Sequence, residues 1–112
     1  MPKPPATAKT PVRQCLNIGP TVGAELESMG LRKYGDLEKL GWEKLIRRYT
    51  QKYPERLEPI VCWVLLGSLL NIPFPQIPEE LRAKGRALCA QLRKERGIVN
   101  GRRVVEVTPR RP

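Results

Sequence analysis

The sequence predicts an all-α protein, and three observations carry that prediction. Residues 60–70 form an uncharged, almost wholly apolar run, too short to cross a bilayer, which takes about 20 such residues. Elsewhere, apolar side chains recur at intervals of three and four, the spacing of amphipathic helices. Gly and Pro stand where such helices begin and end. We therefore expect a compact bundle of about five short helices at residues 12–96, with a flexible basic arm at residues 1–11 and a basic tail at residues 97–112.

The first half of the domain is expected to hold an opening turn and three helices. The turn, at residues 11–16, leads to Asn17 and Gly19, which both tolerate a positive φ. A helix then starts at Pro20, which suits a first helical position. A second helix is expected at residues 33–40. A third, strongly amphipathic helix follows, with its apolar face at Trp42, Leu45, Ile46 and Tyr49.

The apolar run at residues 60–70 is expected to be the central helix. Because its apolar side chains point in every direction, the pattern predicts burial on all sides. Three prolines predict an extended connector at residues 72–78. The last helix opens at Glu79 and ends at Gly97. Its inner stripe is expected at Leu81, Gly85, Leu88, Cys89 and Leu92.

The ends of the chain carry much of its charge. The formal net charge is +10, and each end, residues 1–14 and 97–112, contributes +3. Such a chain attracts polyanions, above all nucleic acid. In the tail, an Asn-Gly pair at residues 100–101 between β-branched runs predicts a short hairpin. We expect the rest of the tail to be disordered.

Composition argues against several classes of site. The chain has no histidine, which removes the commonest acid–base catalyst and a common metal ligand. Its three cysteines, Cys15, Cys62 and Cys89, are far apart and form no Cys-x-x-Cys pair, so we expect buried thiols and no zinc site. We expect no cofactor and no enzymatic activity. With no apolar leader and no membrane span, the sequence predicts a cytoplasmic protein.

The turn at residues 17–20 has a use beyond folding. It leads into a helix, and backbone amides at a helix N-terminus can receive a phosphate oxygen. Gly19 has no side chain to obstruct such an approach. A turn that only packs two helices together would have the same sequence, so both interpretations stay open.

A family resemblance is centred on this turn. Leu16-Asn17-Ile18-Gly19-Pro20, then Met29-Gly30-Leu31, Asp36-Leu37 and Leu40-Gly41, resemble the C-terminal domain of the TfoX/Sxy family of bacterial competence regulators. The run from Trp63 to Leu70 and the segment Glu79-Glu80-Leu81-Arg82 are also similar to that domain. The resemblance implies a helix–hairpin–helix-like unit, and such units grip the nucleic-acid backbone without reading sequence.

Two functional hypotheses follow. The first is a non-enzymatic accessory domain that binds nucleic-acid backbone. The second is a protein-interaction module that docks on transcription or DNA-processing machinery, with its charge facing an acidic partner. For the first hypothesis, the predicted contacts are Ile18, Gly19 and Thr21 in the turn and the cations Arg32, Lys33, Lys44, Arg47, Arg48, Arg82, Arg86 and Arg93. We expect the last three to lie on the outer side of the last helix.

Overall fold

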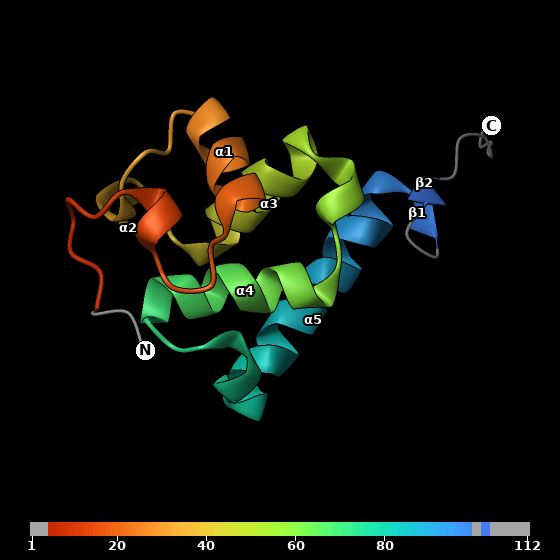
Figure 1. The fold of residues 1–112 in the computed structure, drawn as a ribbon. Coiled ribbons are helices and arrows are strands. Elements are labelled where there is room, and N and C mark those ends of the chain that lie inside the picture. Colours follow the sequence, from red (N-terminus) through yellow and green to blue (C-terminus); the bar gives the residue numbers. More distant parts are fainter. Residues whose placement is uncertain (1–4, 100–101, 104–112) are drawn as a thin grey trace.

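Five α-helices dominate the structure, a computed structural model that describes residues 5–99 and 102–103 (Figure 1). They are α1 (Pro20–Ser28), α2 (Tyr34–Leu40), α3 (Trp42–Lys52), α4 (Pro59–Leu70) and α5 (Glu79–Arg96). Single turns of 3-10 helix lie between or before them: η1 (Val12–Gln14), η2 (Pro54–Arg56) and η3 (Phe74–Gln76). The all-α prediction is confirmed.

Helix α4 lies across the middle of the molecule, with α1, α2 and α3 on one side of it and α5 packed along another (Figure 1). The core draws buried side chains from all five helices. The largest of those that are almost fully buried are Leu26, Leu37, Leu45, Ile46, Tyr49, Leu65 and Leu92. The amphipathic pattern of α3 and most of the inner stripe of α5 are therefore confirmed, because Gly85, Leu88, Cys89 and Leu92 are buried.

The prediction that the central helix is buried on every side is wrong. Cys62, Leu65 and Leu66 of α4 are buried, but Ile60 and Leu70 keep 45% and 46% of their surface exposed. Helices α2, α3 and α5 contact α4, and the connector before α5 contacts it through η3. Helix α1 packs mainly against η1 and not against α4, so one apolar side of α4 is left without a covering helix.

The turn before α1 is fixed to α4 by one side chain. Asn17 has the positive φ of 70° that its sequence allows. Its Nδ2 donates to the carbonyl oxygens of Ile72 (2.9 Å) and Val64 (3.4 Å), and its Oδ1 accepts from the amide of Phe74 (3.2 Å). Gly19 does not use its freedom to adopt a positive φ: it has a φ of −94° as the N-cap of α1.

The described parts of the two terminal segments make hydrogen bonds that fix their positions. The sequence predicts a flexible arm at residues 1–11, but within it Ala6 N donates to Asn71 Oδ1 (3.0 Å), so part of this segment is held against the domain. At the other end, β1 (Ile98–Val99) and β2 (Arg102–Arg103) pair antiparallel, as the predicted hairpin requires. The hairpin's turn residues and residues 104–112 lie outside the described part of the chain.

The connector contains a short helical turn that the sequence does not predict. Pro73, Pro75 and Pro78 exclude an α-helix here, but η3 needs only three residues, and Pro75 lies within it. Ile77 is buried and Phe74 is half-buried, as expected of residues that hold the connector to the core. The connector is therefore partly helical and packs against α4 through η3.

A partly buried ion pair joins α1, α3 and η2. Glu25 accepts hydrogen bonds from Arg56 Nε (3.1 Å) and Nη2 (2.8 Å), and a further one from the Tyr49 hydroxyl. The Arg56 guanidinium holds the pKa of Glu25 below its ordinary value, despite the opposing effect of burial. Burial and the Glu25 carboxylate raise the pKa of Tyr49. Glu25 is thus ionised and fully partnered at neutral pH.

Two glycines give a direct test of how closely the turn packs on α4. A Cβ at Gly67 would lie 2.5 Å from the oxygen of Ile72 and 2.6 Å from Asn17 Nδ2, whereas a Cβ at Gly19 would meet nothing within 4 Å. We expect Gly67→Ala to lower the free energy of unfolding by about 1–3 kcal/mol, the usual cost of overpacking. Gly19→Ala is the matched control and should change it by less than about 1 kcal/mol. Urea unfolding followed by circular dichroism measures both, and equal stabilities would contradict this packing.

Replacing Glu25 should show a characteristic pH dependence. At pH 7 we expect Glu25→Gln to lower the free energy of unfolding by about 2 kcal/mol, because hydrogen bonds to charged groups are lost in a partly buried site. The folded-state pKa of Glu25 is depressed, so its contribution is present above the unfolded pKa and is lost as the pH falls through the folded value. The difference between the two proteins should therefore shrink in acid. Glu55→Gln, at an exposed position of η2, is the control, and a difference independent of pH would contradict the role of ionised Glu25.

Candidate nucleic-acid interface

The turn that the sequence predicts to bind phosphate is largely occupied by its own packing. Ile18 is buried, and its amide already donates to the carbonyl oxygen of Cys15 (3.2 Å). Gly19 and Thr21 are exposed at the start of α1. The side chain of Asn17 faces α4, where it makes the hydrogen bonds described above. Of the three predicted turn residues, only Gly19 and Thr21 are therefore open to a ligand.

Four of the predicted cations are already engaged within the domain. Arg82 donates to the carbonyl oxygens of Ile77 (3.0 Å) and Pro75 (2.7 Å). Arg93 reaches across to the carbonyl oxygen of Leu57 (3.0 Å), and it is half-buried. Arg47 pairs with Glu95 (3.3 Å), and Arg86 pairs with Glu79. The expectation that Arg82 and Arg93 lie on the outer face of the last helix is wrong, because they form contacts between α5 and the segments beside α4.

The other four predicted cations have exposed side chains. They are Arg32, Lys33, Lys44 and Arg48, and they enter none of the ion pairs among the described residues. They fall into two places: Arg32 and Lys33 follow α1, whereas Lys44 and Arg48 lie one turn apart on α3. The structure therefore divides the predicted set and does not gather it on one face.

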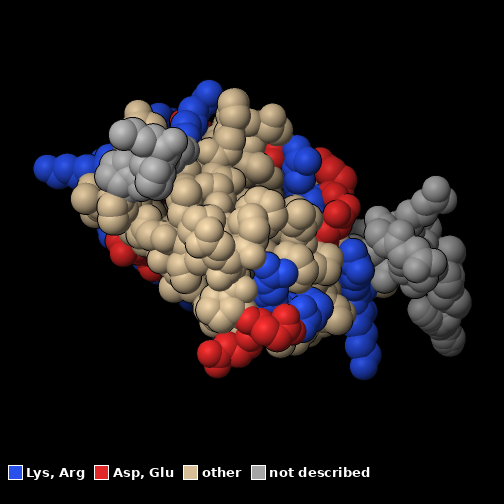
Figure 2. All heavy atoms as spheres, turned by 60° about the horizontal axis from the view of Figure 1, so that its bottom comes forward, with Lys and Arg blue, Asp and Glu red and all other residues tan. Residues whose placement is uncertain are grey.

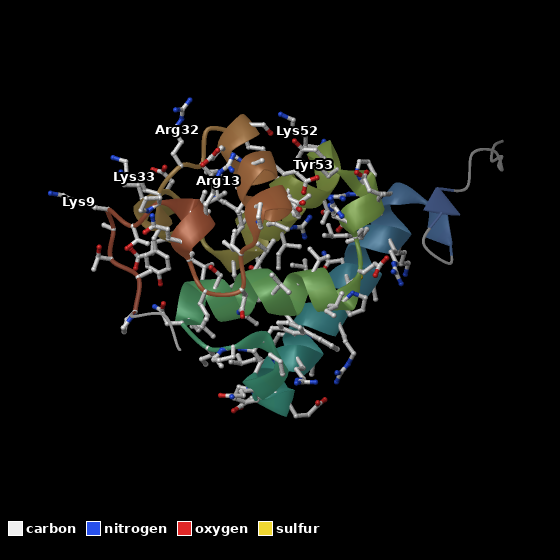
Figure 3. All side chains as sticks on the ribbon, in the orientation of Figure 1. Lys9, Arg13, Arg32, Lys33, Lys52 and Tyr53 are labelled. Carbon is white, nitrogen blue, oxygen red and sulfur yellow. The ribbon has the colours of Figure 1, made fainter. Side chains whose placement is uncertain are left out.

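Lys9, which is not among the predicted contacts, lies near Arg32 and Lys33. Tyr34 N donates to the oxygen of Thr10 (2.8 Å), and Gly35 N donates to the oxygen of Ala8 (3.0 Å). This pairing fixes Lys9, between those two acceptors, beside the start of α2. Lys9 and Lys33 project from the same side of the molecule, and Arg32 lies next to Lys33 (Figure 3). We call Lys9, Arg32 and Lys33 the arm cluster.

The backbone pairing continues under the arm cluster. Val12 N donates to the oxygen of Arg32 (2.9 Å), and Pro11 and Lys33 form an antiparallel bridge. The backbone of the arm and that of the loop after α1 thus lie side by side, while the three cationic side chains are exposed. No local pattern in the sequence predicts this, because the paired residues are at least 20 positions apart.

An acidic side chain organises the loop that carries the cluster. Asp36 accepts hydrogen bonds from the backbone amides of Arg32 (2.9 Å) and Lys33 (3.1 Å). These hydrogen bonds, aided by the charges of Lys33 and Lys39, hold the pKa of Asp36 below its ordinary value. The carboxylate is thus directed at the backbone, and the cationic ends of Arg32 and Lys33 are left to solvent.

Further cations border the arm cluster around α1. Arg13 donates from Nε and Nη2 to Glu27, both at 3.0 Å, and this pairing lowers the pKa of Glu27. Lys52 donates to the carbonyl oxygen of Ser28 (3.2 Å) at the end of α1. Figure 3 shows α1 between Lys52 on one side and Lys9 and Lys33 on the other. These cations are partnered, so they extend the basic surface less strongly than the arm cluster does.

One shallow pocket of about 400 Å³ lies between α3 and α5. It is lined by Trp42, Glu43, Lys84, Ala87, Leu88 and Gln91. Its Glu43 and Lys84 are oppositely charged, so the pocket offers no concentrated field for an anion. Within residues 5–99 and 102–103, no group of three or more Cys, Asp or Glu side chains is placed to hold a metal ion.

A scan against protein-family models, a search of curated proteins and a search of solved structures each found no match to this chain. Among the described helices, none combines the length and the apolar character that a membrane span requires.

Proposed function

We propose that this protein binds the phosphate backbone of nucleic acid without sequence preference, through the arm cluster of Lys9, Arg32 and Lys33. The observation that supports this proposal is the backbone pairing of the arm with the loop after α1, which brings a third cation to two that are adjacent in sequence. All three side chains are exposed and outside the ion pairs of the described residues. When such cations neutralise phosphates, the counterions of the polyanion are released, and this release favours binding.

The chemistry of the arm cluster favours phosphate over bases. Its side chains are long cations, which contact phosphate in most complexes and read bases only when they are positioned in a groove. Tyr34, which directly follows Lys33, is 5% exposed, so its ring offers no platform on which a base could stack. Binding through phosphate alone carries little sequence information.

We further propose a non-enzymatic, accessory role, in line with the resemblance to the TfoX/Sxy C-terminal domain. In this proposal the turn at Asn17 acts mainly by positioning: it fixes the start of α1 on α4, and the loop after α1 presents Arg32 and Lys33. Gly19 and Thr21, exposed at the start of α1, stay secondary candidates for a phosphate contact.

Charge reversal of the arm cluster provides the test. We expect the triple variant Lys9→Glu, Arg32→Glu, Lys33→Glu to bind a labelled random DNA duplex at least about tenfold more weakly at low salt. The slope of log affinity against log salt should also become shallower by about 2–3, because each phosphate contact contributes about 0.9. Fluorescence anisotropy across a salt series measures both quantities.

The matched control is Lys44→Glu, Lys84→Glu, Lys94→Glu, which makes the same charge change at exposed positions of α3 and α5. Equal losses in the two triple variants would mean that net charge alone drives binding, and the arm cluster would then not be the site. Full affinity in the arm-cluster variant would overturn the proposal outright.

A further inference from the structure

The outward side of α4 is apolar although it reaches the surface. Ile60 and Leu70 are about half exposed, and Trp63 and Val64 between them are half-buried. Helix α4 contains no charged residue at all. A helix that served only the core would carry polar residues on its outer side, and an apolar surface of this kind is typical of an interaction site.

This side of α4 belongs to a broad uncharged face. Figure 2 looks onto the side of the molecule that lies at the bottom of Figure 1, and the middle of that face carries neither Lys and Arg nor Asp and Glu. Charged side chains border it. The half-buried Ile72, Pro73 and Phe74 of the connector continue the uncharged surface beyond Leu70.

Trp63 and Arg82 form a preformed anchor within this face. The indole N–H of Trp63 donates to the carbonyl oxygen of Arg82 (3.2 Å), and the Arg82 guanidinium lies 5.0 Å from the centre of the indole ring. Arg82 is itself held by the oxygens of Ile77 and Pro75. Trp and Arg are the residues most often found at the energetic centre of protein interfaces. Because both side chains are already fixed, ordering them costs little entropy when a partner binds.

The apolar residues of this face have helical spacing. Ile60, Trp63 and Val64 occupy positions i, i+3 and i+4, so they form a short ridge along α4. Ridges of this kind pack against another helix. An α-helix with apolar residues on one side is therefore the partner shape that this face fits best.

The charged residues beside the apolar ridge indicate which charge the polar side of the partner helix should carry. Arg86 lies one turn beyond Arg82 on the same side of α5, where it pairs with Glu79, and its side chain is 46% exposed. Both cations lie next to the apolar ridge, because Gly85 of α5 packs against Trp63. A second copy of this chain would bring another net charge of +10 against the first, so self-association is disfavoured. An acidic partner meets no such penalty.

We infer that the outward face of α4, centred on Ile60, Trp63 and Arg82, is a docking site for an acidic amphipathic helix of a partner protein. The site is separate from the arm cluster and does not depend on nucleic-acid binding. The apolar ridge supplies the affinity, and the charge of Arg82, which donates to the neutral carbonyl oxygens of Ile77 and Pro75, favours an acidic partner.

The test uses three synthetic peptides of 18 residues with the full-length protein. The first is an amphipathic helix with leucine on one side and glutamate on the other. The second has the same composition in scrambled order, so that it has no apolar side, and the third has lysine in place of glutamate. Fluorescence anisotropy at about 0.15 M salt measures binding. We expect the first peptide to bind at least about tenfold more tightly than either of the others.

Variants locate the binding on α4. We expect Ile60→Glu to weaken binding of the first peptide about tenfold or more, because it buries a like charge in the interface. Ala24→Glu makes a similar negative substitution at an exposed position of α1 and should leave binding unchanged. The arm-cluster triple variant should also retain it, which separates this site from the proposed nucleic-acid site.

Four results would overturn the inference. Equal binding of the scrambled peptide would mean that charge alone attracts it, and equal binding of the lysine peptide would remove the preference for an acidic partner. Unchanged binding by Ile60→Glu would place the site elsewhere. A dimer of the unbound protein in analytical ultracentrifugation that Ile60→Glu dissociates would assign the face to a second copy of this chain.

Discussion

The amide side chain of Asn17 holds together three segments on which the rest of the domain depends. It satisfies two carbonyl oxygens and one amide in α4 and the connector, and it is placed there by the positive φ of its own backbone. Gly67 makes this possible, because any side chain at that position would occupy the space of the Asn17 amide. This contact fixes the turn before α1 on α4 and thereby helps to position α1. The position of the loop after α1 follows in turn.

That arrangement gives the molecule two chemically different surfaces. The arm pairs with the loop after α1, which gathers exposed cations around one end of the bundle. The outward side of α4 is uncharged and apolar, and its border includes Arg82 and Arg86. Long-range attraction of a polyanion suits the first surface, and short-range packing suits the second. Because different elements carry them, both surfaces could be occupied at once.

The candidate site was harder to predict than the fold, for a physical reason. A sequence pattern assigns a cation to a helix face, but it does not show whether a carbonyl oxygen of another segment lies next to that face and accepts its hydrogen bonds. Arg82 and Arg93 were expected to face outward, yet Arg82 bonds to backbone oxygens of the connector and Arg93 to the backbone oxygen of the distant Leu57. Lys9 was assigned to a flexible arm, and pairing across more than 20 residues brings it to Lys33. Such contacts carry no local signature, since they depend on how whole elements pack.

The sequence by itself determined the five helices and nearly all of their ends. Local chemistry is sufficient for this: Pro20 and Pro59 start helices, and Asn71 and Gly97 end them in the left-handed conformation. Only the tertiary structure decided which apolar and charged faces stay open. The pattern of residues 60–70 predicts a helix that is buried on all sides, but α1 packs mainly on η1 and leaves one side of this helix uncovered. The exposure of Ile60 and Leu70 is the result.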